Sequence, residues 1–200
     1  MSLLFKITYG LYLLSAKDGD KQNGCMVNTI LQQTSTPERI SVTVNKGNYT
    51  CEMIAKTGKF VANILNTNTP FEFVKNFGMQ SGKNAEKFST IKTIFSNSGI
   101  ATNAENSLGF FELKVVDSVD LDTHIMFIAD ITQSESLADG TPLTYAYYQS
   151  NIKPKPVTHP SSEESWVCTI CNYEHKGPLP ADFICPICKH GANDFTRSNS

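Results

Sequence analysis

Arg39-Ile40-Ser41-Val42-Thr43-Val44-Asn45 alternates polar and apolar side chains with a period of two, and Lys46-Gly47-Asn48-Tyr49-Thr50 follows it directly. A period of two predicts a β-strand that buries one of its faces. Asn48 is a favourable N-cap and Gly58 a favourable stop, so we expect a helix that begins around residues 48–50 and ends at Gly58. This part of the chain is therefore predicted to be a strand that turns directly into a short helix.

Further strands and one more helix are predicted around this unit. Leu113-Lys114-Val115-Val116 is predicted to be a strand, and residues 124–131 are predicted to be a strand buried on both faces. Thr69-Pro70-Phe71-Glu72 has the pattern of a capping box with proline at the first helical position, and Gly78 lies where that helix would stop. Strands joined by a few short helices predict a mainly β fold, and we expect a β-barrel with helical connections.

The composition narrows the class of protein. The 200 residues include 40% hydrophobic and 18% charged side chains, which is enough apolar material for a buried core. The formal net charge is −2 and the basic residues are scattered, so we expect no nucleic-acid partner. The apolar stretch at residues 125–129 is too short to cross a bilayer, and the first residues lack the pattern of a secretion signal. We therefore expect a cytoplasmic protein with no membrane partner.

A linker divides the chain into two domains. Pro154, Pro156 and Pro160 alternate with lysine, serine and glutamate, and large apolar side chains nearly vanish there. We predict a large domain at residues 1–150, a linker at 151–164 and a small domain at 165–200. The small domain is too short to fold on apolar burial alone, so a metal or a disulfide is expected in it.

Four cysteines of the small domain form two Cys-x-x-Cys pairs, Cys168 with Cys171 and Cys185 with Cys188. Two such pairs can place four thiolates around one tetrahedral metal ion. Bound thiolates fit a reducing compartment better than disulfides do. Both zinc and iron accept four thiolates, so the spacing alone leaves the two metals open.

The residues around these pairs carry a resemblance. They include Trp166, Tyr173, Pro186 and Phe195. With them, the tail resembles a rubredoxin domain of the short-loop type found at the end of rubrerythrins. The resemblance implies one iron ion that is held by four thiolates and passes single electrons, whereas a zinc ribbon of the same spacing stays the alternative. The sequence departs from the family at Asn172 and Lys189, where glycine is usual.

Two segments of the large domain offer groups for a phosphate-bearing ligand. Residues 28–34 form a run rich in amide and hydroxyl side chains, which could bind the polar atoms of a ligand. Residues 45–50 join the predicted strand to the predicted helix, so free backbone amides, a lysine and a hydroxyl can face an anion together. An ordinary strand that ends at a capped helix offers the same groups.

In their order along the chain, these segments resemble the flavin reductase-like family of FMN-binding split barrels. The residues that carry the likeness lie at 9–12, 28–34, 41–46, 48–50, 60–65, 82–88 and 124–127. The resemblance implies a flavin reductase-like split β-barrel that forms a homodimer with the flavin near the interface. It also implies that the flavin is lined by Asn28, Thr29, Ile30, Gln32 and Thr34, and that the phosphate end of FMN is held by Asn45, Lys46, Tyr49 and Thr50.

Other reactive side chains have simpler interpretations. Lys83 and Lys87 follow in a Gly-Asn loop, where lysines are more often solvated than bound to phosphate. The resemblance to the reductases implies a place near the nicotinamide for His124, but a lone histidine at a strand edge is at least as well explained as a structural hydrogen-bonding residue. Cys25 and Cys51 are most simply small core residues, since neither has a cysteine or histidine close in sequence.

The fusion of the two domains resembles the high-molecular-weight rubredoxins and implies an NAD(P)H-dependent flavin/rubredoxin oxidoreductase. A flavin takes two electrons as hydride and four-thiolate iron changes by one, so the chain would convert between the two. The implied acceptor is a redox protein such as a flavodiiron oxygen or nitric oxide reductase. One alternative is a flavin reductase whose zinc-ribbon tail docks a partner, and another is a flavin-binding sensor without turnover.

Overall fold

The computed structural model describes residues 3–154, 165–170, 173–186 and 190–197. The chain divides into two compact units, residues 1–153 and residues 154–200.

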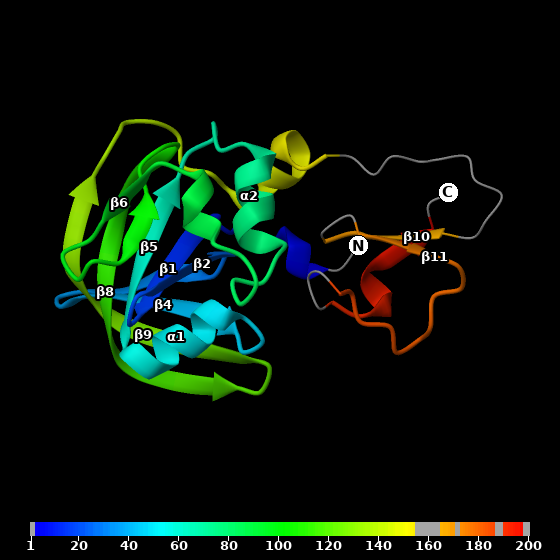
Figure 1. Ribbon diagram of the computed structural model, residues 1–200, viewed down its shortest axis with the longest axis horizontal. Coiled ribbons are helices and arrows are strands. Elements are labelled where there is room, and N and C mark those ends of the chain that lie inside the picture. The colour runs from blue at the N-terminus through cyan, green and yellow to red at the C-terminus, as the bar shows by residue number, and fades with distance from the viewer. Residues whose placement is uncertain (1–2, 155–164, 171–172, 187–189, 198–200) are drawn as a thin grey trace. The chain divides into compact units, whose positions relative to one another are not determined.

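One antiparallel sheet of seven strands forms the large unit (Figure 1). Its strands run in the spatial order β2-β1-β5-β8-β9-β4-β3. Their bounds are β1 Tyr12–Asp18, β2 Lys21–Val27, β3 Ile30–Ser35, β4 Glu38–Asn45, β5 Lys59–Leu65, β8 Ser107–Leu121 and β9 His124–Ser136. The sheet and its few short helices confirm the prediction of a mainly β split barrel, and β4 confirms the strand predicted at residues 39–45.

The interior of the sheet holds the main hydrophobic core. Alternate residues of the strands enter it, among them Leu14, Val42, Phe60, Leu113 and Phe127. Helix α1 (Tyr49–Thr57) adds Met53 and Ile54 to the same core. Cys25 and Cys51 are 2% and 1% exposed in this core, which confirms their interpretation as small core residues.

Helix α1 has the ends that the sequence predicts. The Asn48 side chain accepts a hydrogen bond from the amide of Thr50, and Gly58 closes the helix at a φ of 68°. Helix α2 (Phe71–Gly78) packs Phe73, Val74 and Phe77 into a second apolar cluster.

The start of α2 differs from the prediction. Pro70 is the N-cap and not the first helical residue, and no side chain caps the helix. The hydroxyl of Thr69 instead donates to the backbone carbonyl of Asn66 at 2.8 Å. The capping box is therefore absent because the preceding turn already uses the threonine.

Strand β9 also differs from the prediction. Its register with β4 and β8 sends Phe127 and Ala129 into the core, whereas Met126 and Ile128 lie half-buried on the opposite face. The prediction of burial on both faces is therefore wrong for this single chain, because no element of the large unit covers that second face fully.

Smaller elements complete the large unit. The hairpin of β6 (Thr93–Phe95) and β7 (Ala101–Asn103) covers Val61 and Phe110 of the sheet. The remaining elements are the 3-10 turns η1 (Leu3–Lys6) and η2 (Lys87–Thr90), the short helix α3 (Tyr145–Tyr147) and the π-helical turn η3 (Tyr148–Ile152). Because Tyr148 is 4% exposed and Ile152 packs on the second cluster, the large unit reaches past residue 150 into the predicted linker.

The small unit is a three-stranded sheet with a 3-10 turn. Its strands β10 (Ser165–Cys168), β11 (Glu174–Lys176) and β12 (Phe195–Arg197) lie in the order β11-β10-β12, and η4 spans Ala192–Asp194. The ring of Phe183 lies between those of Tyr173 and Phe195, with centroids 6.5 and 5.3 Å away. Trp166 instead packs under the Arg197 guanidinium, at 5.1 Å. Phe183 is thus the centre of an aromatic cluster that the sequence analysis did not identify.

Candidate functional site

The turn between β4 and α1 is ordered by its own side chains. Oδ1 of Asn45 accepts a hydrogen bond from the amide of Gly47 at 2.8 Å, and Oδ1 of Asn48 accepts one from the amide of Thr50 at 3.1 Å. These bonds occupy the amides of Gly47 and Thr50, and those of Asn48 and Cys51 are bonded within the turn, so the expectation of several free amides here is wrong. The helix dipole at the start of α1 still favours an anion.

Lys46 is bound to a carboxylate at this turn. Its Nζ lies 2.6 and 2.7 Å from the two carboxylate oxygens of Asp120, near the end of β8. The Lys46 hydrogen bond lowers the pKa of the Asp120 carboxyl below its usual value. The Lys46 amide also donates to the carbonyl of Thr123, so the β8–β9 turn is tied to this site.

Thr50 and Tyr49 have different roles. Thr50 is fully buried, and its hydroxyl accepts a hydrogen bond from Nδ2 of Asn23 at 2.9 Å. Tyr49 is partly exposed, and the Nζ of Lys83 lies 5.5 Å from the centre of its ring. Tyr49 is therefore more accessible to a ligand than Thr50 is.

Residues 28–34 do not lie at one place. Thr29 is hydrogen-bonded to the backbone of Thr43, which is two residues before Asn45. Gln32 is opposite Ile40 and Thr34 is opposite Arg39, toward the other end of β4. Asn45 is five residues further along the strand than Ile40, a length of about 17 Å. The structure thus brings Asn28, Thr29 and Ile30 near the β4–α1 turn, and leaves Gln32 and Thr34 exposed at a distance.

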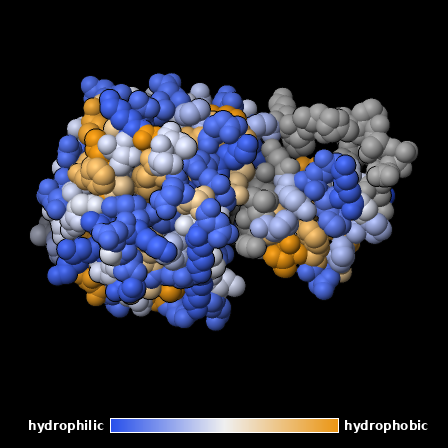
Figure 2. Space-filling view, viewed as in Figure 1, coloured by the Kyte–Doolittle hydropathy of each residue, from blue (hydrophilic) through white to orange (hydrophobic). Residues whose placement is uncertain are grey.

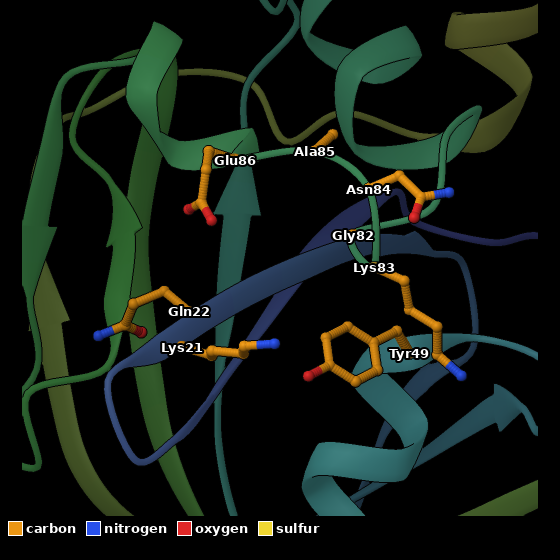
Figure 3. Close-up of a pocket in the computed structure, with 8 residues that line it drawn as sticks. All are labelled: Lys21, Gln22, Tyr49, Gly82, Lys83, Asn84, Ala85 and Glu86. Atoms are coloured by element: carbon orange, nitrogen blue, oxygen red, sulfur yellow. The ribbon is translucent and has the colours of Figure 1, made fainter.

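A polar cavity lies beside Tyr49 (Figure 3). It has a volume of about 230 Å³ and is lined by Lys21, Gln22, Tyr49, Gly82, Lys83, Asn84, Ala85 and Glu86. The Lys21 side chain extends toward the Tyr49 ring (Figure 3). Of the nine residues predicted to bind the flavin, Tyr49 lines this cavity and the other eight do not.

Two residues that line the cavity, Lys83 and Gly82, have close contacts with other parts of the chain. The ammonium of Lys83 is 2.6 Å from a carboxylate oxygen of Glu52 and about half exposed, so this lysine is accessible as predicted. A Cβ on Gly82 would lie 1.8 Å from Oδ1 of Asn23, a buried atom with no hydrogen-bond partner. Glycine is therefore required where the loop meets β2. The sequence pointed to this loop through the family likeness and through Lys83, whereas it gave no signal for Lys21.

Lys87 contradicts the expectation that it is solvated. It is 3% exposed, and its Nζ donates to the carbonyls of Gly24 and Phe77 at 3.0 and 3.1 Å. Burial lowers the pKa of its ammonium from 10.5 to about 8. Lys87 thus holds the loop that lines the cavity in place and is not available to a ligand.

His124 contacts its neighbour in the chain, with Nδ1 2.8 Å from the hydroxyl of Thr123.

The small unit presents buried thiols where a metal is predicted. Cys168 and Cys185 are fully buried, and Cys171 and Cys188 lie outside the described residues. The amide of Cys168 donates to the carbonyl of Tyr173 at 2.9 Å, and the amide of Cys185 donates to that of His190 at 2.8 Å. These bonds bring the backbone of Cys168 next to that of Tyr173 and the backbone of Cys185 next to that of His190. A turn closed in this way can point two sulfurs the same way. The donor chemistry fits a thiolate metal site.

Comparisons with known families match both units. Residues 4–155 match the family described as "Flavin reductase like domain". Residues 166–196 match the family described as "Rubrerythrin, rubredoxin-like domain". Within the described residues, no helix has the length and apolar character needed to cross a membrane.

Similar proteins include two curated relatives and a solved structure. The chain is 35% identical to a high molecular weight rubredoxin of Moorella thermoacetica, with 97% of each chain covered. It is 33% identical to a ferric-chelate reductase (NAD(P)H) of Archaeoglobus fulgidus, with 76% of this chain and 89% of that one covered. An FMN-binding protein from Thermus thermophilus shares the fold, with a TM-score of 0.63 at 16% identity over 70% of this chain and 80% of that one.

Proposed function

The chain belongs to the flavin reductase-like family and ends in a rubredoxin-like domain, and on that basis we propose that it passes electrons from NAD(P)H, through FMN and a four-cysteine iron, to a protein acceptor. It is an oxidoreductase of electron transfer. The observation that carries the proposal is the presence of both domains in one chain. A flavin exchanges two electrons and four-thiolate iron exchanges one, so the pair can convert between donors and acceptors of the two kinds.

The residues around Tyr49 suit the phosphate end of FMN. Lys21 and Lys83 bring two ammonium groups to the cavity, and the start of α1, the positive end of the helix dipole, lies beside it at Tyr49. We assign the phosphate to this region, with Asn45, Lys46, Tyr49 and Thr50 kept as predicted contacts and Lys83 added. Asn28, Thr29 and Ile30 then lie within reach of the ribityl chain or the ring. The FMN-binding protein of Thermus thermophilus supports the choice of flavin, and the ferric-chelate reductase (NAD(P)H) supports the donor.

A homodimer would complete the flavin site. The cavity of about 230 Å³ is smaller than the ~300–1,000 Å³ of most ligand pockets, so one chain offers room for one end of FMN. The face of β3, β4, β9 and β8 that points away from the core carries Leu31, Val119 and Leu121 at 64%, 40% and 45% exposure. We call these three residues, with Met126 and Ile128, the outer apolar face. A second copy that covers it could also bring flavin contacts such as Gln32 and Thr34.

The small unit suits iron held by Cys168, Cys171, Cys185 and Cys188. Two of these thiols are fully buried in a unit stabilised by few apolar side chains, so a bound metal would supply much of its folding energy. Cysteines that bind a metal as thiolates persist in a reducing compartment, and we therefore place the protein in the cytoplasm. The acceptor that we propose, following the family likeness, is a flavodiiron oxygen or nitric oxide reductase.

Metal analysis with Cys171→Ser tests the iron assignment. We expect one iron per chain in the parent protein, and loss of the iron and of its visible colour in the variant. FMN content should stay unchanged, because the cysteine belongs to the other unit. Full occupancy by zinc in protein produced with ample iron would contradict iron and favour the docking zinc ribbon.

Ligand titration tests the phosphate site. Lys46→Ala and Lys83→Ala should each weaken FMN more than riboflavin, which lacks the phosphate, by roughly 3- to 10-fold for an exposed charge-assisted contact. Lys75→Ala on α2 is the matched control, since Lys75 is exposed and pairs only with Glu72 among the described residues. An equal loss for both ligands would contradict a phosphate role.

Rapid mixing with NAD(P)H tests the order of electron flow. We expect flavin bleaching first and iron bleaching afterwards, because a metal held by four thiolates has no site for hydride. A chain that ends at Lys153 keeps the whole large unit and should keep flavin reduction while losing fast delivery to a one-electron protein acceptor. Full-speed delivery by the shortened chain would make the tail a docking module.

A further inference from the structure

Three lysines come together on adjacent strands of the large unit. Lys59 of β5 is directly opposite Lys114 of β8 in the sheet register. The β1–β5 pairing ends at Ser15 and Val61, and Lys17 lies two residues beyond Ser15, on the same face of β1, beside the strand that carries Lys59. Since directly opposite residues share a face of the sheet, we call Lys17, Lys59 and Lys114 the lysine row.

The side chains confirm this arrangement at one surface turn. Nζ of Lys59 donates to the hydroxyl of Ser98 at 3.2 Å. Nζ of Lys17 lies 3.3 Å from the position that a Cβ on Gly99 would take. Both ammonium groups therefore lie beside the turn at residues 98–99, on the face opposite the barrel core.

The lysine row has little counter-charge. None of the ion pairs within the described residues involves its three members. Asp130 is opposite Lys114 and its carboxylate is attracted by that ammonium, but the same carboxylate is 2.7 Å from Arg39, which adds a further cation. Glu112 is 5% exposed, and its carboxylate accepts a hydrogen bond from the Ser98 hydroxyl to which Lys59 donates. The three lysines and Arg39 thus outnumber these two carboxylates, so the local balance of charge is positive although the whole chain has a net charge of −2.

This placement works against folding. Like charges directly opposite each other on neighbouring strands, as in Lys59 and Lys114, destabilise a sheet. A protein of slightly negative net charge has no general need for such a row. The cost is explained if the row attracts an anionic partner.

We propose that the lysine row is a docking surface for an acidic redox protein. This rests on the proposed function, which requires a protein partner that exchanges electrons with the chain. Neighbouring strands lie about 4.8 Å apart, so the row extends over about 10 Å, a span that suits a cluster of carboxylates on a protein surface. The cavity beside Tyr49 is not lined by any of the three lysines, so a small ligand in that cavity does not account for them. Complementary charge chiefly raises the rate of association.

Binding of a strongly acidic rubredoxin, purified separately, tests the docking surface. The holoprotein and the variant Lys17→Gln/Lys59→Gln/Lys114→Gln are compared with a control, Lys6→Gln/Lys75→Gln/Lys92→Gln, in which exposed lysines elsewhere are changed and the net charge is the same. At low salt we expect about tenfold slower association for the lysine-row variant, and about twofold or less for the control. The difference should shrink as salt shortens the Debye length below about 10 Å.

Three outcomes would overturn the docking surface. The first is an equal loss of association rate in both variants, and the second is no loss of association rate in either variant. The third is a parent protein that does not bind the acidic rubredoxin and instead binds single-stranded DNA through the lysine row. Flavin content, metal content and NAD(P)H oxidation are measured on the same preparations. A parent protein that lacks flavin and metal and does not oxidise NAD(P)H contradicts the proposed function. The association rates test the docking surface independently of those three measurements.

Discussion

Lys87 is buried although its place in the sequence predicts an exposed lysine. A lysine after Gly82-Lys83-Asn84 is predicted to be solvated, yet its ammonium is buried and satisfied by two backbone carbonyls. Lys83, four residues earlier, is half exposed as predicted. The two lysines differ because the loop turns back onto β2 at Gly82, where Asn23 leaves no room for a side chain. Only the packing of that loop separates them.

The pKa of Lys87 predicts a pH dependence of stability. The folded pKa is about 8 and the unfolded value is 10.5, because burial disfavours the charged ammonium. Between these values the unfolded chain binds more protons, so the free energy of unfolding should rise with pH, by roughly 3 kcal/mol at most. Lys87→Met should remove this rise in urea unfolding curves recorded from pH 7 to 10.5.

Lys83→Met is the control for this measurement, since it removes an exposed lysine of the same loop. It should keep the slope of the parent protein. If Lys87→Met shows the parent slope as well, Lys87 is protonated throughout this pH range and its two carbonyl partners outweigh the cost of burial.

Helices α1 and α2 show when the end of a helix can be predicted from the residues next to it in the sequence. The ends of α1 follow the prediction because Asn48 and Gly58 act within their own turns. The predicted capping box of α2 fails because Thr69 has a competing acceptor, the carbonyl of Asn66, in the turn before the helix. A cap can therefore be predicted from sequence when no neighbouring turn competes for the same side chain.

The end of α1 carries a prediction about stability. Gly58 has a φ of 68° and open space around its Cα, so Gly58→Ala meets a backbone penalty and no clash. We expect a loss of about 1 kcal/mol in urea unfolding. Gly58→Asn should lose less, because asparagine adopts this conformation more readily. Equal losses for alanine and asparagine would show that something other than backbone conformation is responsible.

In the molecule as a whole, a single chain does not bury both faces of β9, although the sequence predicts that it does. Its apolar run predicts burial on both faces, and the single chain buries only the face with Phe127 and Ala129. A homodimer through the outer apolar face would bury the other. The sequence pattern and the exposed Leu121 and Val119 thus point to the same missing contact.

Sedimentation tests this contact. Val119→Asp/Leu121→Asp should convert a dimer into a monomer, because buried unpaired carboxylates oppose association. Phe95→Asp is the control, since Phe95 is 63% exposed on the β6–β7 hairpin and outside the outer apolar face. FMN should also bind more weakly to the double variant. A parent protein that sediments as a monomer, or a double variant that stays dimeric, would contradict the homodimer.

Features that depend on neighbours along the chain could be predicted from the amino-acid sequence. These are the period-two strand at residues 39–45, the helix between Asn48 and Gly58, and the two cysteine pairs. Each is encoded within a few residues, because strand alternation, helix capping and ligand spacing are local. The family likeness then supplied the split barrel as a whole.

Which distant residues meet depends on the fold and could not be predicted from the sequence pattern. Lys17, Lys59 and Lys114 are scattered in the sequence, and strand register gathers them into one row. Lys21 and Lys83 come to one cavity from β2 and a distant loop, while Gln32 and Thr34 lie apart from the β4–α1 turn. The physical reason is that strand pairing and loop packing join segments far apart along the chain, and no local pattern records which segments will pair.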